Sequence, residues 1–366
     1  MNNAAIPALP GADQLRESAP AASTVVVRAI TAGDLDGLLA LAQQVGDGMT
    51  TLKPDRRMLG KRIETACASF AETIAPDQRD YVFVMEDVSC ARLVGVCAIK
   101  SAVGLDEPFY NYRIGTLVHS STELGVFSRM ETLYLSNDLT GCAELCSLFL
   151  HPDYRHGNHG KLLSKSRFLF MAQFPHLFST RLIAEMRGFQ RDDGTSPFWD
   201  HLGQHFFKMD FERADSISSL GKKSFIAELM PRHPLYVAYL PQVAQEVIGV
   251  VHHDTAPARR LLEQEGMYYE GYVDIFDAGP VLQARVSELR ATRESRLLEA
   301  TSAAPSAARA ESMALVASTA MGDFRVIVAP GAAAAQQIAL TEAEHALLHC
   351  AAGQQVRAMS LNLPKK

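Results

Sequence analysis

The sequence predicts an α/β (α+β) protein in which helices flank a mixed central sheet. Residues 144–150 form a nearly continuous apolar run of strand length, which is typical of a central strand covered on both faces. A turn punctuated by glycines follows, and leucines and phenylalanines then recur at helical spacing. The chain has 366 residues, 48% of them hydrophobic, which is enough for a large core and for two domains of about 100–200 residues each.

The segments before the central strand predict two helices, a hairpin and an insertion. Thr31, with Asp34 three residues later, resembles an N-cap that opens the first helix. Two valine-rich runs joined by a polar turn favour an antiparallel hairpin. The expected elements are a strand over 24–30, the helix after Thr31, a helix over 56–74, hairpin strands over 81–85 and 93–99, and strands or loops over 108–115 and 131–135.

The segments after the central strand suggest a second pass through similar elements. ARRLLEQEGM (258–267) echoes SPFWDHLGQHFF (196–207), since each resembles a short apolar helix followed by a glycine and a strand. We therefore expect a second, partial half that shares one core with the first. The expected elements are strands over 181–186, 205–209, 225–229 and 272–276, helices over 196–203, 242–248 and 256–265, and a small β element within 324–363.

Composition excludes several classes of protein. The net charge is −6 and no run of Lys or Arg forms a stripe, so nucleic acid is not expected as a partner. No apolar stretch reaches about 18 residues, so no membrane span is expected. The first 22 residues lack the basic start and apolar block of a signal peptide and are expected to be a disordered tail. The six cysteines contain no CxxC pair, which suits buried thiols in a reducing cytoplasm.

The turn after the central strand is a candidate anion site. Gly157 and Gly160 allow a tight turn and the close approach of a ligand. A helix that begins there presents unpaired N–H groups and a partial positive charge, which most often bind phosphate. An ordinary strand–turn–helix crossover is the alternative. The cations in this stretch are Arg155, Lys161, Lys165 and Arg167.

This order of elements, with an anion turn after the fourth strand, resembles the GNAT superfamily of acyl-CoA N-acyltransferases. In that superfamily the turn holds the CoA pyrophosphate and carries Arg/Gln-x-x-Gly-x-Gly/Ala. The corresponding stretch here is RHGNHG (155–160), in which the glycines are shifted and Asn158 stands where a glycine is usual. Asn tolerates positive φ better than most residues, so the loop is expected to survive. The resemblance implies a central strand splayed from its neighbour, with backbone N–H groups free for the thioester.

The resemblance also suggests how the sequence is divided. The expected parts are a tail over 1–22, a GNAT-like acyl-CoA-binding domain over 23–215, a second GNAT-like half over 216–300 with the catalytic histidine, an Ala- and Ser-rich linker over 301–320, and a small C-terminal β element over 321–366.

Eight blocks together resemble a narrower family, the arginine N-succinyltransferases of bacterial arginine degradation. The resemblance spans residues 25–293 and is weaker over the C-terminal part. It implies the reaction of succinyl-CoA with L-arginine to give CoA and N2-succinylarginine, and it assigns Leu148 to succinyl-CoA. The blocks are FYNYRIGTLVH (109–119), LSNDLTG (135–141), ELCSLFLHPDYR (144–155), GKLLSKSRF (160–168), AEMRG (184–188), SPFWDHLGQHFF (196–207), FIAELMP (225–231) and YVDIFDAGP (272–280).

The family pattern also indicates a catalytic histidine. Its segment Val-Ile-Gly-x-Val-His corresponds to VIGVVHHDT (247–255), which selects His252. The field of the helix that starts near Thr255 would lower the pKa of this residue and keep it a neutral base at pH 7. His253 stands where the family often has Pro, so either of the two histidines could face the site, and His233 is a third candidate.

Two further patterns bear on the chemistry. Many GNAT enzymes protonate the departing thiolate with a Tyr, but Trp199 and Leu262 occupy the comparable places here, so the acid role also falls to His252. Three histidines around the anion turn suggest a metal site. Their glycine-rich, Arg-flanked context favours phosphate instead, and zinc usually requires closed ligation, so no metal is expected. These histidines are His151, His156 and His159.

Charged residues near the predicted strand ends are candidates for the substrates. Arg113 and Arg187 suit the carboxylates of succinate and arginine, because the guanidinium fork matches a carboxylate. The guanidinium of arginine requires acids, and each acid here could instead belong to a structural ion pair. These acids are Glu144, Glu185, Asp274 and Asp277.

The resemblance implies succinyl-CoA as a co-substrate, L-arginine as the acceptor and no permanently bound cofactor. Two alternatives remain open. The acceptor could be ornithine or another amino acid, or the protein could be a CoA-binding partner subunit of low activity in a paired succinyltransferase. A homo- or hetero-oligomer with a related subunit is compatible with the two-half layout.

Overall fold

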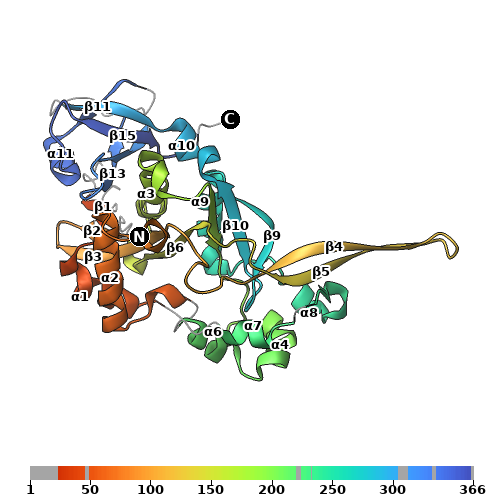
Figure 1. Cartoon of the computed structure of the whole chain (residues 1–366). Coiled ribbons are helices and arrows are strands. Elements are labelled where there is room, and N and C mark those ends of the chain that lie inside the picture. Colours follow the sequence, from red (N-terminus) through yellow and green to blue (C-terminus); the bar gives the residue numbers. More distant parts are fainter. Residues whose placement is uncertain are drawn as a thin grey trace, which may run out of the picture.

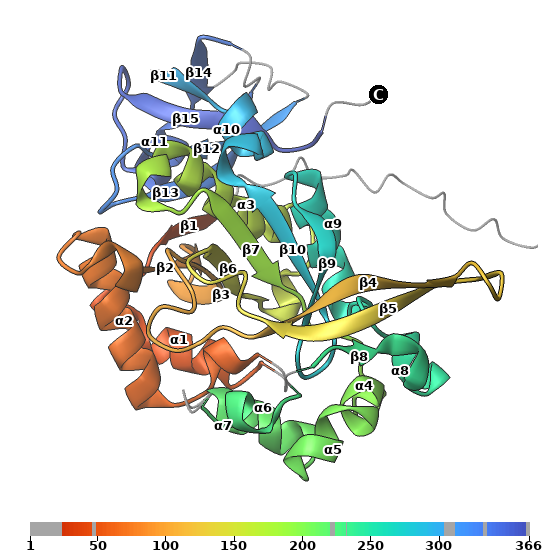
Figure 2. The same ribbon diagram turned by 45° about the vertical axis from the view of Figure 1, so that its right-hand side comes forward.

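The computed structural model describes residues 24–45, 49–219, 224–231, 233–303, 312–331 and 335–363, and the predicted tail over 1–22 lies outside them. The described strands form one sheet in the order β14-β11-β15-β12-β13-β1-β2-β3-β6-β7-β10-β9-β4-β5-β8. In its middle, β6 and β7 are parallel and their outer neighbours antiparallel, which makes the predicted mixed sheet (Figures 1 and 2). The middle strands are β1 Val25–Ala29, β2 Asp80–Asp87, β3 Arg92–Lys100, β6 Ala143–Leu150, β7 Arg181–Glu185, β10 Pro280–Arg285 and β9 Tyr268–Asp274.

Helices cover both faces of these strands because successive strand residues are apolar in both directions. Val82 and Val84 of β2 join a core cluster with the first two helices. Phe83 and Met85, the residues between and after them, join the cluster under α3 and α9 on the opposite face. The helices that sandwich the sheet are α1 Leu35–Ala42, α2 Arg56–Phe70, α3 His159–Gln173 and α9 Ala256–Gln264.

The part predicted as a second half completes the same sheet. β10 pairs with β7, and β9 pairs with both β10 and β4, so the two parts share one sheet. β9 begins four residues earlier than the predicted strand over 272–276. β10 was not predicted, because it begins at Pro280, the last residue of the expected closing turn DAGP.

A long hairpin of β4 Asn111–Ser121 and β5 Val126–Ser136 projects from the body as an arm (Figure 1). It lies where strands or loops were expected. Its base pairs with β9, and β8 Leu235–Tyr236 adds to the side of β5.

Two strand predictions are wrong, because residues 205–209 and 225–229 lie in or beside helices. In residues 205–209, the helical turn allows the ring of Phe207 to stack on Trp199, with the ring centroids 5.2 Å apart. In the second, Ile226 and Met230 are buried at a spacing of four, which is a helical period. Short apolar runs fit both periods, so the sequence alone did not separate them. The helices of this region are α4 Pro197–His201, α5 Gly203–Phe207, α6 Phe211–Ser219, α7 Ser224–Leu229 and α8 Gln242–Gln245.

The C-terminal β element is larger than predicted and continues the main sheet through the β13–β1 pair. The segment expected to be a linker holds the end of β11 and all of β12. Its small residues looked like a loose segment, yet Ala314 and Val316 are fully buried between sheet and helix. The elements are α10 Arg290–Glu294, β11 Arg296–Ser302, β12 Met313–Ala317, β13 Arg325–Pro330, β14 Gln337–Leu340, α11 Glu342–Leu348 and β15 Gln355–Ser360.

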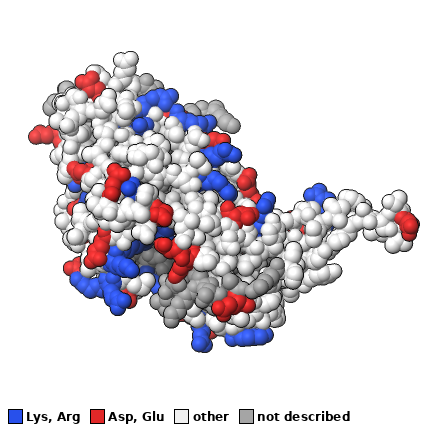
Figure 3. Space-filling view, viewed as in Figure 1, with Lys and Arg blue, Asp and Glu red and all other residues white. Residues whose placement is uncertain are grey.

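On the face shown in Figure 3, basic and acidic side chains both occur over the coloured residues, and basic side chains gather at the lower left and along the upper part of the body. Within the described residues, every helix is too short or too polar to cross a membrane.

Candidate active site

The central strand separates from its parallel neighbour halfway along its length. Among the described residues, β6 pairs with β7 only at Ala143 with Leu182 and at Glu144 with Ile183. Beyond these pairs the two strands diverge, so the β7-facing edge of β6 is open towards its carboxyl end. This is the splay that the sequence resemblance implied.

A bulge marks the place where β6 turns away. The register with β3 shifts by one residue between Cys146 and Phe149. Ser147 takes a positive φ of 54°, which is uncommon for a residue other than glycine. An extra residue of this kind bends a strand and re-aims its groups. Leu148 follows directly and is half-buried against the core under α3, so its backbone lies at the opening.

The loop after β6 leads into the start of α3 as predicted. Gly157 supplies the positive φ, at 58°, whereas Asn158 has a φ of −105° and acts as the N-cap. The residue with left-handed backbone in this loop is therefore a glycine, and Asn158 does not need to adopt the positive φ that the sequence suggested for it. Arg155 Nε donates to the C=O of Leu150 over 3.0 Å, and Lys161 Nζ donates to Asn362 Oδ1 over 2.7 Å. Gly160 lies beside Lys161 in the first turn of this 15-residue helix.

Two cations that we expected beside the loop are instead buried. Lys165 and Arg167 are 0% and 2% exposed. Lys165 forms an ion pair with Glu265 over 2.8 Å and donates to Leu361 O over 3.1 Å. It therefore joins α3 to the segment after α9 and to the C-terminal element, and it does not face the anion turn.

His252 lies at the same edge of the sheet as the open end of β6. Its backbone N–H donates to the C=O of Arg187 over 2.9 Å, and Val251 bridges to Gly188. Residues 186–188 follow β7 directly, and β7 is parallel to β6, so the carboxyl ends of both strands open at one edge. His252 is thus attached to one side of the gap and the anion turn to the other.

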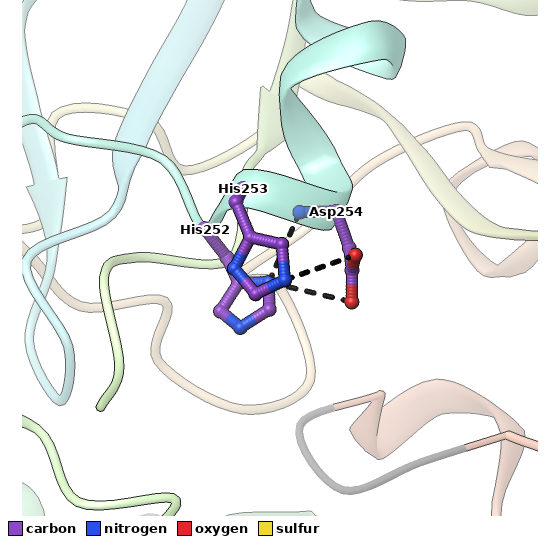
Figure 4. A group of neighbouring side chains, drawn as sticks. All are labelled: His252, His253 and Asp254. Carbon is purple, nitrogen blue, oxygen red and sulfur yellow. Dashed lines mark hydrogen bonds and ion pairs between the residues drawn. The ribbon is translucent and has the colours of Figure 1, made fainter. Parts of the chain in front are cut away.

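The environment of His252 favours the neutral ring. The residue is 7% exposed, and burial is the main cause that lowers its pKa. The charge of Arg187 and the neighbouring His253 lower it further, while Asp254 acts in the opposite direction. His252 Nδ1 accepts the N–H of Asp254 over 3.3 Å and lies 3.8 Å from Asp254 Oδ2 (Figure 4).

The structure distinguishes the candidate histidines by burial. The imidazole of His253 is 76% exposed and pairs with Asp254 over 3.2 Å. His233 is also exposed. Of the three, only His252 is buried against the end of β7.

The three histidines around the anion turn contact neighbouring side chains and backbone, and the rings of His156 and His159 lie 4.8 Å apart. His151 Nε2 lies 2.8 Å from an Arg92 nitrogen, and His159 Nδ1 lies 3.2 Å from Tyr154 O. Within the described residues, the group whose ligand atoms lie close enough for a metal is His252, His253 and Asp254. Two of these three residues are exposed, and all three come from one short turn.

Asp277 supports the segment that carries Arg187. Its two oxygens accept the N–H of Gly188 over 2.7 Å and of Gly279 over 2.8 Å. Burial raises its pKa well above the usual range, and Asp274 raises it further. A Cβ at Gly188 would lie 2.4 Å from Asp277 O, so this crossing requires glycine. Asp274 in turn accepts the N–H groups of Phe276 and Asp277.

Other acids predicted for the guanidinium lie on one face of the sheet. Glu144 is buried on β6, 3.8 Å from Lys100 Nζ. Glu185 accepts from Asn111 Nδ2 over 2.8 Å. Glu144 is opposite Ile183 on β7, and Glu185 is two residues further, so their carboxylates point to the same side.

Arg113 is already neutralised. It pairs with Asp138 over 3.3 Å and lies 5.5 Å from the centre of the Tyr272 ring, whose hydroxyl donates to the same carboxylate. In the part of the structure that is described, no hydrogen bond or ion pair joins it to His252.

The sequence analysis missed Gln190. Its Oε1 accepts from Nε and Nη2 of Arg187, the first at 3.1 Å, while its Nε2 is buried without a partner among the described residues. Its position three residues after Arg187 was the one available signal. Arg62, also missed, reaches the bulge from the other face and donates to Ser147 Oγ over 2.8 Å.

The two residues expected at the place of a GNAT tyrosine have internal contacts. Trp199 Nε1 donates to Met209 O over 3.0 Å, and Leu262 lies in the core.

A splayed parallel pair, a bulged central strand, a glycine turn that opens a long helix and a buried neutral histidine define an acyltransferase with a GNAT fold. The comparisons with known proteins agree and are narrower. The family model described as "Arginine N-succinyltransferase beta subunit" matches residues 25–291. The protein belongs to the arginine N-succinyltransferase family.

Individual relatives match over nearly their whole length. The arginine N-succinyltransferase of Shigella flexneri serotype 5b (strain 8401) is 47% identical over 342 residues, which cover 93% of this sequence and 99% of the relative. That of Enterobacter sp. (strain 638) is 47% identical over 337 residues, or 92% and 98% of the two sequences. The structure of arginine/ornithine succinyltransferase subunit AI from Pseudomonas aeruginosa matches with a TM-score of 0.84, 32% identity and coverage of 93% and 99%.

Proposed function

We propose that this protein transfers the succinyl group of succinyl-CoA to the α-amino group of L-arginine, which gives N2-succinylarginine and CoA. The observation that carries the proposal is a buried, neutral His252 beside the open edge of β6. The names of the relatives supply the donor and the acceptor. A CoA thioester as donor, and six free cysteines, suit a cytoplasmic enzyme.

The proposed reaction moves one proton through His252. The neutral amine attacks the thioester carbon, the C–N bond forms and the C–S bond breaks. In the tautomer with hydrogen on Nδ1, that N–H faces Asp254 and Nε2 takes the proton from the amine. The imidazolium that results gives the same proton from Nε2 to the sulfur of CoA as the C–S bond breaks, which restores the tautomer with hydrogen on Nδ1. In the other neutral tautomer Nδ1 accepts the Asp254 N–H and Nε2 carries the hydrogen, so that form can donate a proton at Nε2 but cannot accept one there. No proton is gained or lost overall.

The donor is proposed to lie along β6. The first turn of α3, from Gly157 to Lys161, suits the CoA phosphates because its N–H groups and the helix dipole attract anions. Backbone N–H groups beside Leu148 suit the developing oxyanion.

The acceptor is proposed to lie between His252 and the acids of the sheet. The amine and carboxylate of arginine share one carbon, so the carboxylate must bind close to the base. Arg187 and the unpartnered Nε2 of Gln190 are donors at that place. Glu144 and Glu185 suit the guanidinium. Glu144 and Glu185 also have partners within the fold, Lys100 and Asn111. Arg113, half exposed and paired with Asp138, and Asp277, whose two oxygens accept backbone N–H groups, are weaker candidates.

The test is the release of free thiol by purified protein. Succinyl-CoA and acetyl-CoA are each combined with arginine, ornithine and lysine. We expect release with succinyl-CoA and arginine, and a loss of about 100-fold or more in His252→Ala, as for removal of a general base. His253→Ala, on the exposed neighbour, is the matched control and should keep most activity. Wild-type rates in His252→Ala would refute the catalytic assignment.

A second candidate function is succinyl transfer to another acceptor, such as ornithine, or a role as the partner subunit of a paired succinyltransferase. The Pseudomonas aeruginosa protein is called an arginine/ornithine succinyltransferase subunit. Preference for ornithine in the same assay would support the other acceptor. Binding of CoA without turnover, restored by a co-expressed related protein, would support a partner subunit.

A further inference from the structure

Arg167 is a buried cation without an acidic partner. It lies in the third turn of α3 and is 2% exposed. Its Nε donates to Ser164 O and one terminal nitrogen to Ser164 Oγ, both over 3.2 Å. Within the described residues, no carboxylate forms an ion pair with it. Its electrostatic neighbours are the thiols of Cys97 and Cys146, and burial lowers its pKa.

Two other cations in the same layer are compensated. Lys165 and Arg290 both pair with Glu265, at 2.8 and 3.0 Å. Arg290 also donates to Ser360 O. These groups connect α3, the end of α9 and the C-terminal element, and their charges are used within the fold. Arg167 differs from them because, among the described residues, its hydrogen bonds go to the carbonyl and hydroxyl oxygens of Ser164 in its own helix. Burying a charge in this way is costly, which indicates a role for the cation itself.

The position of Arg167 on α3 places it over β6 and β3, since its electrostatic neighbours are Cys146 and Cys97 of these two strands. Gly160, Ser164 and Arg167 share one side of the helix, at positions i, i+4 and i+7. This side faces β6, since a Cβ at Gly160 would lie 4.0 Å from a Leu150 methyl group. Arg167 is eight residues into α3, roughly 12 Å from its start. That places it at the level of Cys146 and the bulge, well past the anion turn.

Succinyl-CoA has negative charge at both ends, and each end corresponds to one place on α3: the phosphates to the start of the helix and the succinyl group to Arg167. In the proposed function, the CoA phosphates lie at the start of α3 and the thioester lies at the bulge. The free carboxylate of a succinyl group is two methylene groups beyond the thioester carbonyl. We propose that Arg167 binds this free carboxylate and thereby selects succinyl over acetyl donors. This inference rests on the proposed function and gives it a residue for donor specificity. Arg187, beside His252, remains available for the carboxylate of the acceptor.

The test compares two donors in Arg167→Met. Methionine keeps an unbranched apolar stem and removes the charge. With saturating arginine, kcat/KM for succinyl-CoA should fall about 10- to 100-fold, the effect of a lost charge-assisted hydrogen bond. The value for acetyl-CoA should change less than about threefold, because acetyl has no carboxylate. Arg167→Lys should recover part of the preference. An equal loss with both donors would assign Arg167 to the oxyanion or to stability and overturn the proposal.

Direct binding separates this proposal from the proposed function. By calorimetry, Arg167→Met should bind succinyl-CoA more weakly than wild type and free CoA equally well. This comparison needs no turnover, so it stands even where the wild type fails to succinylate arginine. Arg357→Met is the matched control. Arg357 is half-buried, donates to Gln173 Oε1 and Ser295 Oγ, and within the described residues has no acidic partner either. Its removal should leave the donor ratio unchanged. Unchanged affinity for succinyl-CoA in a folded Arg167→Met or Arg167→Leu protein would overturn the proposal.

Discussion

The backbone N–H of His252 donates to the backbone carbonyl of Arg187 over 2.9 Å. This bond joins the turn before α9 to the segment after β7. Because β7 is parallel to β6, it fixes the histidine at the edge where the central strand opens. The same Arg187 disfavours a charge on the His252 ring, so one residue both positions the base and lowers its pKa.

Asp277→Asn tests whether Asp277 supports this arrangement or binds substrate. Both of its oxygens accept backbone N–H groups, and an amide can replace only one of them. We expect a loss of about 1–3 kcal/mol in the free energy of unfolding, together with a lower kcat, because the segment that carries Arg187 loosens. Urea denaturation and steady-state rates measure both. A higher KM for arginine at unchanged stability would return Asp277 to the substrate site. Asp138→Asn, at the exposed ion pair with Arg113, is the control and should cost less than about 1 kcal/mol.

Gln190→Ala tests the site for the carboxylate of the acceptor. The free Nε2 of Gln190 is expected to donate to this carboxylate, so its removal should raise KM for arginine about tenfold. KM for succinyl-CoA should stay the same, since the donor lies on the other side of the gap. Initial rates over a matrix of both substrates give the two constants separately. Agmatine, which lacks the carboxylate, should be used equally by wild type and variant. Equal arginine KM values would exclude Gln190 from the site.

Local patterns predicted the elements that local forces determine. The capping box of Thr31 and Asp34 is present, although the helix opens with a 3-10 turn. The hairpin over β2 and β3 and the strand–turn–helix unit from β6 to α3 are also confirmed. Short apolar runs and Ala-rich strands failed, because their state depends on which neighbour covers them.

The residues of the candidate site also fall into two groups: those that a local sequence pattern predicts and those that become notable only in the folded structure. The anion turn is visible in the sequence, since glycine spacing and a following helix are local features. His252 came from the family pattern, because nothing in VIGVVHHDT tells a buried histidine from an exposed one. Gln190 and Arg167 become notable only through burial and missing partners, which no sequence pattern displays.

Glu265→Gln tests the buried cluster that binds α3 to the C-terminal element. Glu265 is 0% exposed and pairs with Lys165 and Arg290. Its neutralisation removes the carboxylate partner of the buried Lys165 and leaves Arg290 with the half-exposed Glu294 at 3.4 Å. We expect a loss of about 3–5 kcal/mol in the free energy of unfolding, measured by urea denaturation. Glu263→Gln, in an exposed i,i+4 pair with Arg259 near the end of the same helix, should change it by about 0.5 kcal/mol or less. A similar loss of unfolding free energy in Glu265→Gln and Glu263→Gln would contradict the role of Glu265 in joining α3 to the C-terminal element.

The pH dependence of kcat/KM for arginine tests the state of His252. Only the neutral amine attacks, so the logarithmic profile should rise with a slope of one below the pKa of the α-amino group of arginine. At lower pH the slope should become two where His252 also takes up a proton. Because burial and Arg187 lower the pKa of His252, this break should lie below 6.5.

The same lowered pKa of His252 also affects the stability of the protein. The unfolded protein takes up the proton first, so the contribution of His252 is present above pH 6.5 and is lost as the pH falls. Arg187→Met should move the break upward, towards 6.5, whereas His159→Gln should leave it in place. A break above 6.5 in the wild type, or an unmoved break in Arg187→Met, would contradict this account of the base.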